Sequence, residues 1–550
     1  MNSANNYINQ LYSIRNRYGK QFAVKKMRLL YAIHNPHYKG RGKRALQAYY
    51  DALLFIIAYP DNKAIYTAAN DALAQLQSYI GSKENLRTSL YNSGVTGSAV
   101  CAAFGFEMVK WLRKTHSRDI TLSSFEASNA QIQAILSVVM PKVESEILQD
   151  ANAEWRGWLK RSKKDGEDML DQLVAIFAST TIRPEVKDEL WNAIGVNTEI
   201  NLSSHCSLPP GLVIPYYHRS LRRKNINDER NEFKATRITL NKFEAEEVLD
   251  CSRMVLIRHL REIDSISFSA PALITYYQLS RGLSIALMSM VAARRHPIDS
   301  YMGYVVFKNG LPVAYAGSWI MFDSARISLN VFPAYRGGES QYIFQQAMQL
   351  HRKVYGLKRF SVDPYQIGKE NSDGIKSGSF WVYYHAGFRP LLKAQQELAE
   401  TEARKLATLR GYRSSKQILV KLADSRMQLT MDKSAIQIDA TDLSLLWLAI
   451  LKKKYDNDRV SASADGAKKL AAIIQLENWR EDQINFVLEN WAIILLANEN
   501  ELRENNSLKR SVKKLIELKA EGREENYIHV LQKAAPVRKF LERLLTKQTQ

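Results

Sequence analysis

A glycine-rich turn between an expected strand and an expected helix is the stretch of this sequence most suited to chemistry. Apolar residues alternate from Ser328 to Pro333, the turn follows as YRGGES (residues 335–340), and an amphipathic helix continues to Met348. Such a turn leaves backbone N–H groups unpaired at the positive end of the helix dipole, and glycine lets a ligand approach them closely. The sequence therefore predicts a phosphate-binding site. No Lys-Ser/Thr pair follows the glycines, which argues against an ATP-type phosphate loop.

A second segment with two glycines, SGVTGS (residues 93–98), precedes a strongly apolar stretch that reaches Trp111 and Leu112. We expect that stretch to be a helix. The segment is then either a second anion-binding turn or a set of small residues that allow close helix packing.

Cysteine usage and apolar runs exclude several classes of protein. Cys101, Cys206 and Cys251 are scattered and form no pair with metal-ligand spacing, so neither a zinc site nor a disulfide framework is expected. The longest apolar runs, such as 52–59 and 443–451, are much shorter than the ~20 residues of a membrane span. The chain begins without an apolar secretory core. We expect a cytoplasmic protein with no metal and no membrane partner.

The net charge of +21 is the outstanding feature of the composition. The first fifty residues contain no Asp or Glu, and five tyrosines are interspersed with the basic side chains. An anionic partner fits this pattern, either nucleic acid, an acidic protein or a phosphorylated cofactor. A solvated basic helix with buried tyrosines fits it equally well. The residues concerned are Arg15, Arg17, Lys20, Lys25, Lys26, Arg28, Lys39, Arg41, Lys43 and Arg44, with Tyr7, Tyr12, Tyr18, Tyr31 and Tyr38.

Changes in pattern along the chain predict four regions. Apolar residues recur at helical spacing through residues 1–200, which we expect to form a helical domain with a basic N-terminal arm. Residues 201–232 are rich in Ser, Pro and Arg and indicate a linker or arm. Residues 233–392 mix strand and helix patterns, and residues 393–550 return to helix.

The mixed region has the most informative order of elements. Its strongest local signal is a β-hairpin around Asn309-Gly310, the preferred two-residue turn. The expected elements are a strand at 235–240, helices at 242–262 and 271–295, hairpin strands at 302–307 and 313–321, strands at 327–332 and 358–362, a polar loop at 363–375 and a helix at 376–386.

This order resembles that of the GNAT superfamily, which transfers an acyl group from acyl-CoA to an amine. Two motifs carry the resemblance: VFPAYRGGES (331–340), which looks like the family's pyrophosphate-binding turn, and SFWVYYHAGFRP (379–390), which is similar to its helix with a Tyr shortly before Gly-Phe. The resemblance implies an α/β (α+β) acyl-CoA N-acyltransferase-like core with a mixed, mostly antiparallel sheet, flanked by all-α N- and C-terminal regions.

The resemblance also implies roles for individual residues. The backbone N–H groups of 336–340 would bind the CoA pyrophosphate, with charge added by Arg336. The strand ending at Phe332 would diverge from the strand beginning at Lys358, and the Val331 N–H would polarise the thioester carbonyl in the gap. For Glu339, the carboxylate must point away from the phosphates to avoid repulsion. The implied acyl-CoA-binding residues are Val331, Phe332, Arg336, Gly337, Gly338, Glu339 and Ser340.

Tyr383 occupies the position of the family's general acid, which protonates the departing thiolate, and Tyr384 is the alternative. A phenol suits this role because it is protonated at neutral pH and hydrogen-bonds readily to a sulfur. The general base stays open, because the acceptor amine can also lose its proton to water. Its candidates are Asp323, Glu339, Asp363, His296 and His385.

These patterns support two hypotheses for function. The first is an N-acyltransferase that uses acetyl-CoA or another acyl-CoA and an acceptor amine that the motifs do not specify. The alternative is a non-catalytic protein with a GNAT-like core that binds nucleic acid or an acidic partner through its basic helices.

Overall fold

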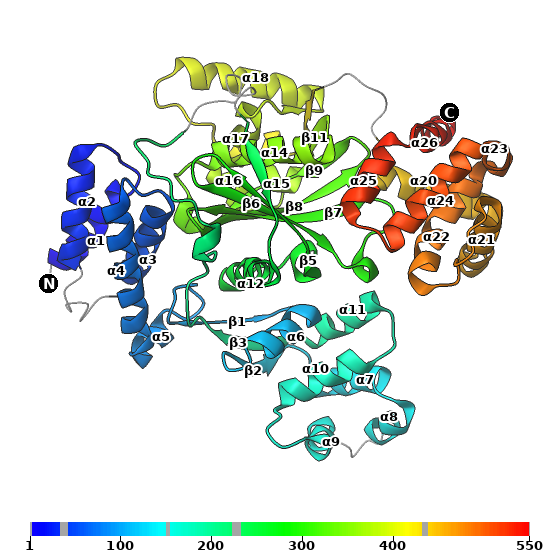
Figure 1. Ribbon diagram of the computed structural model, residues 1–550, viewed down its shortest axis with the longest axis horizontal. Helices are drawn as coiled ribbons and strands as arrows, with labels where there is room; N and C mark the ends of the chain where they lie inside the picture. Colours follow the sequence, from blue (N-terminus) through cyan, green and yellow to red (C-terminus); the bar gives the residue numbers. More distant parts are fainter. Residues whose placement is uncertain (1–2, 34–41, 150–153, 223–232, 432–437, 549–550) are drawn as a thin grey trace.

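A mixed β-sheet with helices on both faces forms the centre of the computed structural model, which describes residues 3–33, 42–149, 154–222, 233–431 and 438–548 (Figure 1). The strands follow the order β12-β13-β11-β9-β8-β7-β6-β5-β4, and β10 pairs with β8 beside this path. Neighbouring strands are antiparallel, apart from the parallel pair β9 and β11. The expected mixed, mostly antiparallel sheet is confirmed. Its strands are β4 (Ala235–Ile238), β5 (Ser269–Leu279), β6 (Leu283–Met290), β7 (Ser300–Lys308), β8 (Leu311–Met321), β9 (Ser324–Ile327), β10 (Asn330–Val331), β11 (Arg359–Val362), β12 (Arg389–Pro390) and β13 (Met427–Thr430).

Helices cover both faces of the central sheet. α12 lies on one face, and α14 and α17 lie on the other (Figure 1). The polar loop expected at 363–375 contains two short helices. The helices within this part of the chain are α12 (Lys242–Arg258), α13 (Asp264–Ser267), α14 (Ser340–Tyr355), α15 (Pro364–Ile367), α16 (Ser372–Ser377) and α17 (Ser379–His385).

The hairpin expected at Asn309-Gly310 joins β7 to β8, as the sequence indicates. Both turn residues have positive φ angles, 46° and 86°, which is the conformation that this dipeptide favours. The Asn309 side chain accepts a hydrogen bond from the Tyr216 N–H (2.8 Å) and donates one to the Ala58 carbonyl (3.0 Å). The tip of the hairpin thus ties the sheet to the N-terminal helices.

One expected helix in this region is wrong. In place of one helix, residues 271–295 contain most of β5, all of β6 and a single 3₁₀ turn at Ala292–Arg294. Every residue of β6 is buried, so the strand shows a continuous apolar run without the alternation that marks a half-exposed strand. The turn between the two strands contains Arg281 and Gly282, both with positive φ.

The expected all-α N-terminal region is also corrected. Residues 99–201 contain an antiparallel three-stranded sheet in the order β1-β3-β2, and the segment 93–98 leads into β1 instead of a helix. This sheet and its helices have an apolar core of their own, whereas α1–α4 share the core of the central sheet. The elements are α1 (Ser3–Ile14), α2 (Lys20–Ile33), α3 (Lys43–Ala58), α4 (Lys63–Gly81), α5 (Glu84–Ser89), β1 (Ala99–Ala103), α6 (Phe106–Thr115), β2 (Ile120–Phe125), α7 (Asn129–Val139), α8 (Lys142–Gln149), α9 (Trp155–Ser162), α10 (Met169–Ser179), α11 (Pro184–Ile194) and β3 (Val196–Asn201).

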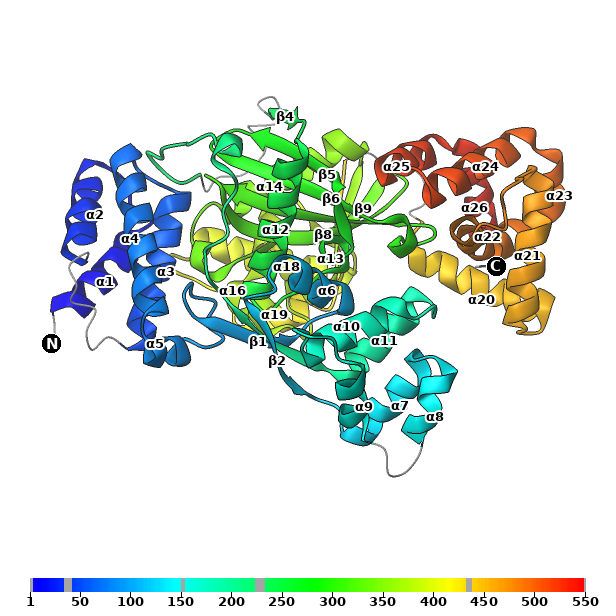
Figure 2. The same ribbon diagram turned by 60° about the horizontal axis from the view of Figure 1, so that its bottom comes forward.

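The C-terminal region is helical with one exception. β13 inserts between β11 and β12, so the central sheet extends past the boundary expected at residue 392. The remaining helices, from α20 on, enclose a third apolar core at the opposite end of the molecule from α1 (Figure 2). The helices are α18 (Lys393–Thr408), α19 (Lys416–Leu422), α20 (Ala440–Tyr455), α21 (Arg459–Ile474), α22 (Asp482–Leu495), α23 (Glu499–Glu504), α24 (Asn506–Ala520), α25 (Glu524–Lys533) and α26 (Ala535–Gln548).

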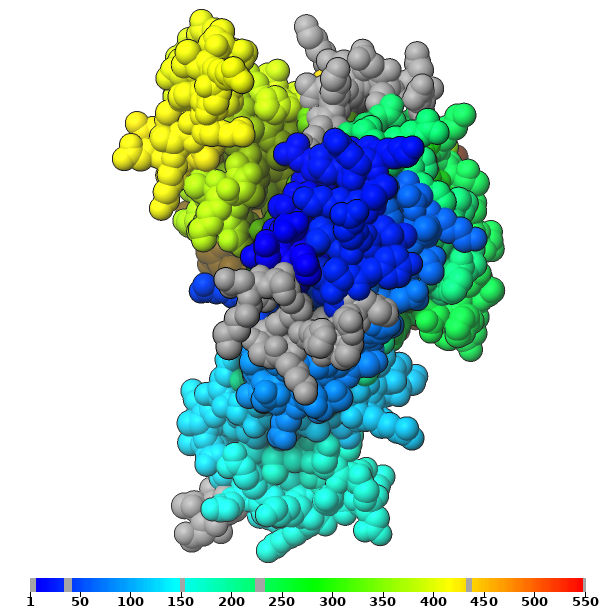
Figure 3. Space-filling model, turned by 90° about the vertical axis from the view of Figure 1, so that its left-hand side faces the viewer, coloured from blue at the N-terminus to red at the C-terminus, as the bar shows by residue number. Residues whose placement is uncertain are grey.

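The basic N-terminal segment packs on the rest of the protein. Lys26 is buried and bonds Asp61 (2.6 Å), Arg15 lies over the Tyr12 ring, and the Tyr18 hydroxyl donates to the Tyr59 carbonyl (3.0 Å). Figure 3 looks onto these helices, shown in blue, with α18 in yellow on the same face. Tyr38, Lys39, Arg41 and residues 223–232 of the expected linker lie outside the described residues. No helix in the described part of the chain is long and apolar enough to cross a membrane.

Candidate functional site

The glycine-rich turn lies between β10 and α14, where the sequence places it. A short 3₁₀ helix at Pro333–Tyr335 leads into it. Gly337 has a φ of 84°, a conformation that side-chain-bearing residues rarely adopt. At Gly338, an added Cβ would lie 2.9 Å from Cζ of Tyr59, so the second glycine lets the turn pack against α3. The two glycines therefore serve different purposes.

The turn offers fewer free N–H groups than the sequence suggests. The Arg336 N–H donates to the Pro333 carbonyl and the Gly338 N–H to the Tyr335 carbonyl, both at 3.2 Å. The Ser340 N–H, at the first position of α14, has no acceptor among the described residues. α14 also has no acidic residue in its first turn and no side-chain cap. The positive end of its dipole is therefore uncompensated at Ser340.

The Glu339 carboxylate does not face this site, which agrees with the expectation that it points away from a bound phosphate. Its side chain is buried and turned into the protein, where it bonds Lys308 (2.9 Å), Arg281 and the Arg222 N–H (2.9 Å). Burial acts to raise the pKa of Glu339, but the Lys308 and Arg281 charges outweigh burial and lower it. Burial lowers the pKa of Lys308 to about 8, although Glu339 opposes the shift. Glu339 thus holds the turn against the hairpin strand β7, and its charge is turned away from the exposed side of the turn.

The turn borders a cavity of about 630 Å³, here called the inner cavity, which runs from Arg336 to Tyr383. The cavity brings together most of the site residues expected from the sequence: Val331, Phe332, Arg336, Gly337, Ser340 and Tyr383. Gly338, Glu339 and Tyr384 do not line it. Arg336 is exposed and forms no ion pair with a described residue.

Two strands separate near the inner cavity, which is lined by β10 and by α15, the helix that follows β11. β9 and β11 are paired from Arg359↔Ser324 to Ser361↔Arg326, and the chain then leaves β11. β10 pairs only with β8. The end of β11 pairs with β13, through Val362 and Met427, and not with β10. The expected gap between the two strands is therefore present, although the strand expected at 327–332 is divided into β9 and β10.

Val331 presents its backbone N–H to the gap. The Phe332 N–H donates to the Val313 carbonyl (3.0 Å), so Phe332 is a hydrogen-bonded position in the pairing of β10 with β8. Hydrogen-bonding positions alternate in antiparallel pairs, so the N–H of the preceding residue points away from β8. Val331 is one of the residues that line the inner cavity. This geometry agrees with the expected carbonyl-polarising donor.

Tyr383 lies in the wall of the inner cavity and is 3% exposed. Its ring packs edge-on against Phe344, with centroids 5.0 Å apart, and its hydroxyl lies close to the Leu329 N–H. Burial raises the pKa of Tyr383 to about 12, so the phenol is protonated at neutral pH. The adjacent Tyr384 points elsewhere and stacks under the Arg389 guanidinium (4.0 Å). The structure separates the two tyrosines that the sequence left as alternatives.

None of the candidate general bases lines the inner cavity. Asp323 pairs with Arg359 and Arg538, and Asp363 with Arg326 and Arg426. The other three candidates are also accounted for: Glu339 faces inward, His296 bonds Asp299, and His385 lines a neighbouring cavity.

The cavity contains two basic residues that the sequence did not reveal. His259 and Arg261 follow α12, and the His259 ring stacks on Phe332 with centroids 4.4 Å apart. Burial, together with nearby arginines, lowers the pKa of His259 to about 3, so its ring is neutral. The end of α12 was the only feature of the sequence near His259 that could have indicated a role for it. Its contact with Phe332 could not be predicted, because the two residues lie far apart in the sequence. Asp373 of α16 supplies a carboxylate to the same cavity.

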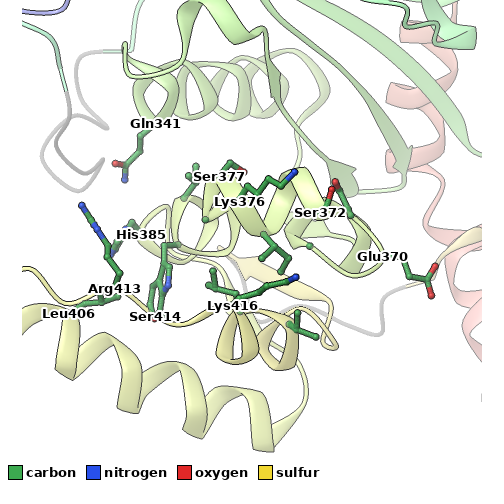
Figure 4. A pocket seen from close by; sticks show the side chains of 18 residues that line it. Gln341, Glu370, Ser372, Lys376, Ser377, His385, Leu406, Arg413, Ser414 and Lys416 are labelled. Atoms are coloured by element: carbon green, nitrogen blue, oxygen red, sulfur yellow. The ribbon is translucent and has the colours of Figure 1, made fainter. Parts of the chain in front are cut away.

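A larger cavity of about 1120 Å³, the outer cavity, is lined by residues of α16, α17, α18 and α19 (Figure 4). Asn371, Ser377 and Val382 line both cavities. Among the described residues, no group of three or more His, Cys, Asp or Glu side chains is placed to hold a metal ion. Comparisons with protein-family models, curated proteins and solved structures each give no match.

Proposed function

We propose that this protein is an N-acyltransferase that moves an acyl group, most simply acetyl, from acyl-CoA to an acceptor amine. The observation that supports this function is the gap between β10 and β11, with an uncapped helix N-terminus at one end and a protonated tyrosine in its wall. The order of elements from residue 233 to residue 390 also supports this proposal, because it resembles the order of the GNAT superfamily.

The residues present suit a CoA diphosphate at the turn. The Ser340 N–H and the α14 dipole favour an anion, and Arg336 adds a mobile positive charge. Glu339 is withdrawn into its bonds with Lys308 and Arg281, which removes the repulsion that its position in the sequence would suggest. The pantetheine chain then extends along β10 into the inner cavity.

The thioester lies between β10 and Tyr383 in this proposal. The amine nitrogen attacks the carbonyl carbon, while the Val331 N–H stabilises charge on the carbonyl oxygen. The C–S bond breaks as the C–N bond forms, and Tyr383 donates its proton to the departing sulfur. With a pKa of about 3, His259 is too weak a base to hold the proton of the amine, which therefore passes to water. Solvent restores the Tyr383 proton.

Calorimetric titration of the full chain with acetyl-CoA tests the proposal. We expect saturable binding with one site per chain. Heat no greater than dilution at millimolar ligand would rule out the acyltransferase. Coenzyme A without the acyl group serves as a second ligand, because it fills the same turn and pantetheine path.

The alternative, a non-catalytic protein that binds nucleic acid or an acidic partner, rests on the exposed cations of α2. Lys20, Lys25 and Arg28 are exposed, whereas Lys26 is buried. Replacing the three exposed residues with Gln leaves the apolar side of α2 intact. If the alternative holds, this variant loses salt-dependent binding to mixed-sequence DNA or RNA. Equal binding by the variant and the parent protein would exclude α2 as the contact surface.

A further inference from the structure

The outer cavity begins at the end of the glycine-rich turn, residues 335–340. Ser340 lines the inner cavity, and the next residue of α14, Gln341, lines the outer one. CoA carries its diphosphate between the pantetheine arm and a 3′-phosphorylated adenosine. If the pantetheine occupies the inner cavity, the nucleotide leaves the turn toward the outer cavity. This step rests on the function proposed above.

Helices α18 and α19 form the outer wall of that cavity. They connect β12 to β13, which are neighbours in the sheet, so the chain leaves and re-enters the sheet at one place. The two ends of this segment are joined by the Ser425 hydroxyl, which accepts hydrogen bonds from the N–H groups of Leu391 and Leu392, both at 3.0 Å. The pair of helices is thus a fixed attachment to the sheet edge.

The outer cavity is positively charged. Lys376 comes from α16, and Arg413 and Lys416 come from the α18–α19 segment. None of the three forms an ion pair with a residue that the structure describes. Glu370 is the one acidic lining residue, and Figure 4 shows it at the opposite end of the cavity from Arg413 and Gln341. A wall of Trp381, Leu406 and Leu419 supplies apolar surface for a flat ring.

Arg413 is held in place by its neighbours. The hydroxyls of Tyr412 and Ser414, on either side of it, donate to Glu402 at 2.7 and 2.9 Å. Glu402 is 1% exposed and also bonds Lys405 (2.8 Å). A buried carboxylate that fixes both neighbours of an exposed arginine restricts the loop and lowers the entropy cost of ligand binding. Glu402 is therefore a positioning residue for Arg413.

From this arrangement we infer that the α18–α19 segment reads the 3′-phosphate of CoA. Arg413, which lies on the same side of the cavity as Gln341 (Figure 4), binds the phosphomonoester, and Lys376 and Lys416 add positive charge from elsewhere in the cavity. The Trp381 side supports the adenine, and Glu402 keeps Arg413 in position. The segment makes the protein selective for CoA over dephospho-CoA, which is identical except for that phosphate.

Calorimetry with CoA and dephospho-CoA on the full chain tests this inference. We expect CoA to bind about tenfold more tightly, the sum of a few partly exposed charge pairs. The double variant Arg413→Gln/Lys416→Gln should lose this preference and keep the parent affinity for dephospho-CoA. Lys421→Gln, an exposed lysine of α19 outside the cavity, is the matched control and should keep the preference. Glu402→Gln should reduce the preference while leaving dephospho-CoA affinity unchanged.

The outcomes separate the two proposals. Failure of both nucleotides to bind would overturn the acyltransferase function itself. Equal affinity of the parent protein for CoA and dephospho-CoA would overturn the phosphate-reading role alone. The phosphate-reading role would also be overturned if the double variant lost affinity for CoA and dephospho-CoA equally. Arg413 and Lys416 would then not contact the phosphate by which the two ligands differ.

Discussion

Residues 93–98 and 335–340 look alike in sequence, yet the protein uses their backbone groups in opposite ways. In the first segment, the Gly97 N–H donates to the Leu202 carbonyl (2.8 Å) and the Gly94 carbonyl accepts from the buried Arg258 (2.7 Å). An added Cβ at Gly97 would lie 2.8 Å from the Gln77 carbonyl oxygen. The close-packing interpretation of this segment is therefore the correct one. In the second segment, the Ser340 N–H has no acceptor in the described structure.

The difference lies in the element that comes after each segment. Residues 93–98 lead into β1, and the N–H groups of Ser93, Val95, Gly97 and Ser98 are taken up by hydrogen bonds within the turn or to Leu202. Residues 335–340 lead into α14, whose first N–H groups have no partner within the helix. Glycine content alone therefore does not determine whether backbone N–H groups stay unpaired; the element that follows the turn also decides this.

The largest expected effect is on stability, at the first segment. The Arg258 guanidinium donates to the Tyr50 hydroxyl, the Thr96 hydroxyl and the Ser204 carbonyl, as well as to Gly94. Arg258→Met leaves the Gly94 and Ser204 carbonyls without this donor, at roughly 1–3 kcal/mol each, whereas the Tyr50 and Thr96 hydroxyls keep their bond to each other (2.9 Å). The free energy of unfolding should therefore fall by about 4 kcal/mol in urea denaturation. The exposed Arg118→Met should change it by less than about 0.5 kcal/mol. If Arg258→Met lowered the free energy of unfolding only slightly, the backbone bonds of residues 93–98 would not be structural, and the contrast with residues 335–340 would fail.

A somewhat smaller loss of stability is expected at Glu339. Glu339→Gln leaves Lys308 and Arg281 without a counter-charge, and the free energy of unfolding should fall by about 3 kcal/mol at pH 7. The folded pKa of Glu339 lies below its ordinary value of 4.5, so its contribution is complete above that pH and is lost as pH falls through the folded pKa. The variant should therefore lose part of the acid dependence of unfolding. Unchanged stability with weaker CoA binding would instead place Glu339 in the ligand site.

Catalysis should depend on one of the two adjacent tyrosines. Tyr383→Phe removes the proton donor, so kcat should fall about 100-fold while the affinity for acetyl-CoA is kept. Tyr384→Phe lies one position away, outside the inner cavity, and should retain parent activity. Steady-state kinetics with calorimetry measures both quantities. Lost binding without lost turnover in Tyr383→Phe would show that its hydroxyl is not the acid.

The smallest effect is expected at the phosphate turn. Arg336→Gln should weaken CoA binding about fivefold to tenfold through loss of a charge-assisted contact, with no change in the unfolding midpoint. Arg118→Gln, also exposed, controls for net charge. An affinity equal to the parent value would leave the turn without a role in binding the diphosphate.

Local signals in the sequence were reliable where structure is local. The Asn309-Gly310 hairpin and the turn at 335–340 follow from neighbouring residues and their order. The separation of the strand before that turn from β11 was expected only from the family resemblance. The tyrosine in the cavity wall was also identified, but only as one of two, because the sequence does not define which side of α17 is buried.

Non-local pairing explains most of what the sequence missed. β13 is a short strand that gains its position from β11, which lies far earlier in the chain, so no local periodicity marks it. β1, β2 and β3 are short strands among helices, and β6 is too uniformly buried to alternate. The inward turn of Glu339 depends on Lys308 and Arg281, and His259 reaches Phe332 only through packing of α12 on the sheet.

A structure of the protein with bound CoA tests the central comparison most directly. We predict the diphosphate within hydrogen-bond distance of the Ser340 N–H and the Arg336 guanidinium, the pantetheine beside β10, and no ligand at residues 93–98. The comparison would be contradicted if the diphosphate lay at residues 93–98, or if CoA bound outside the gap between β10 and β11.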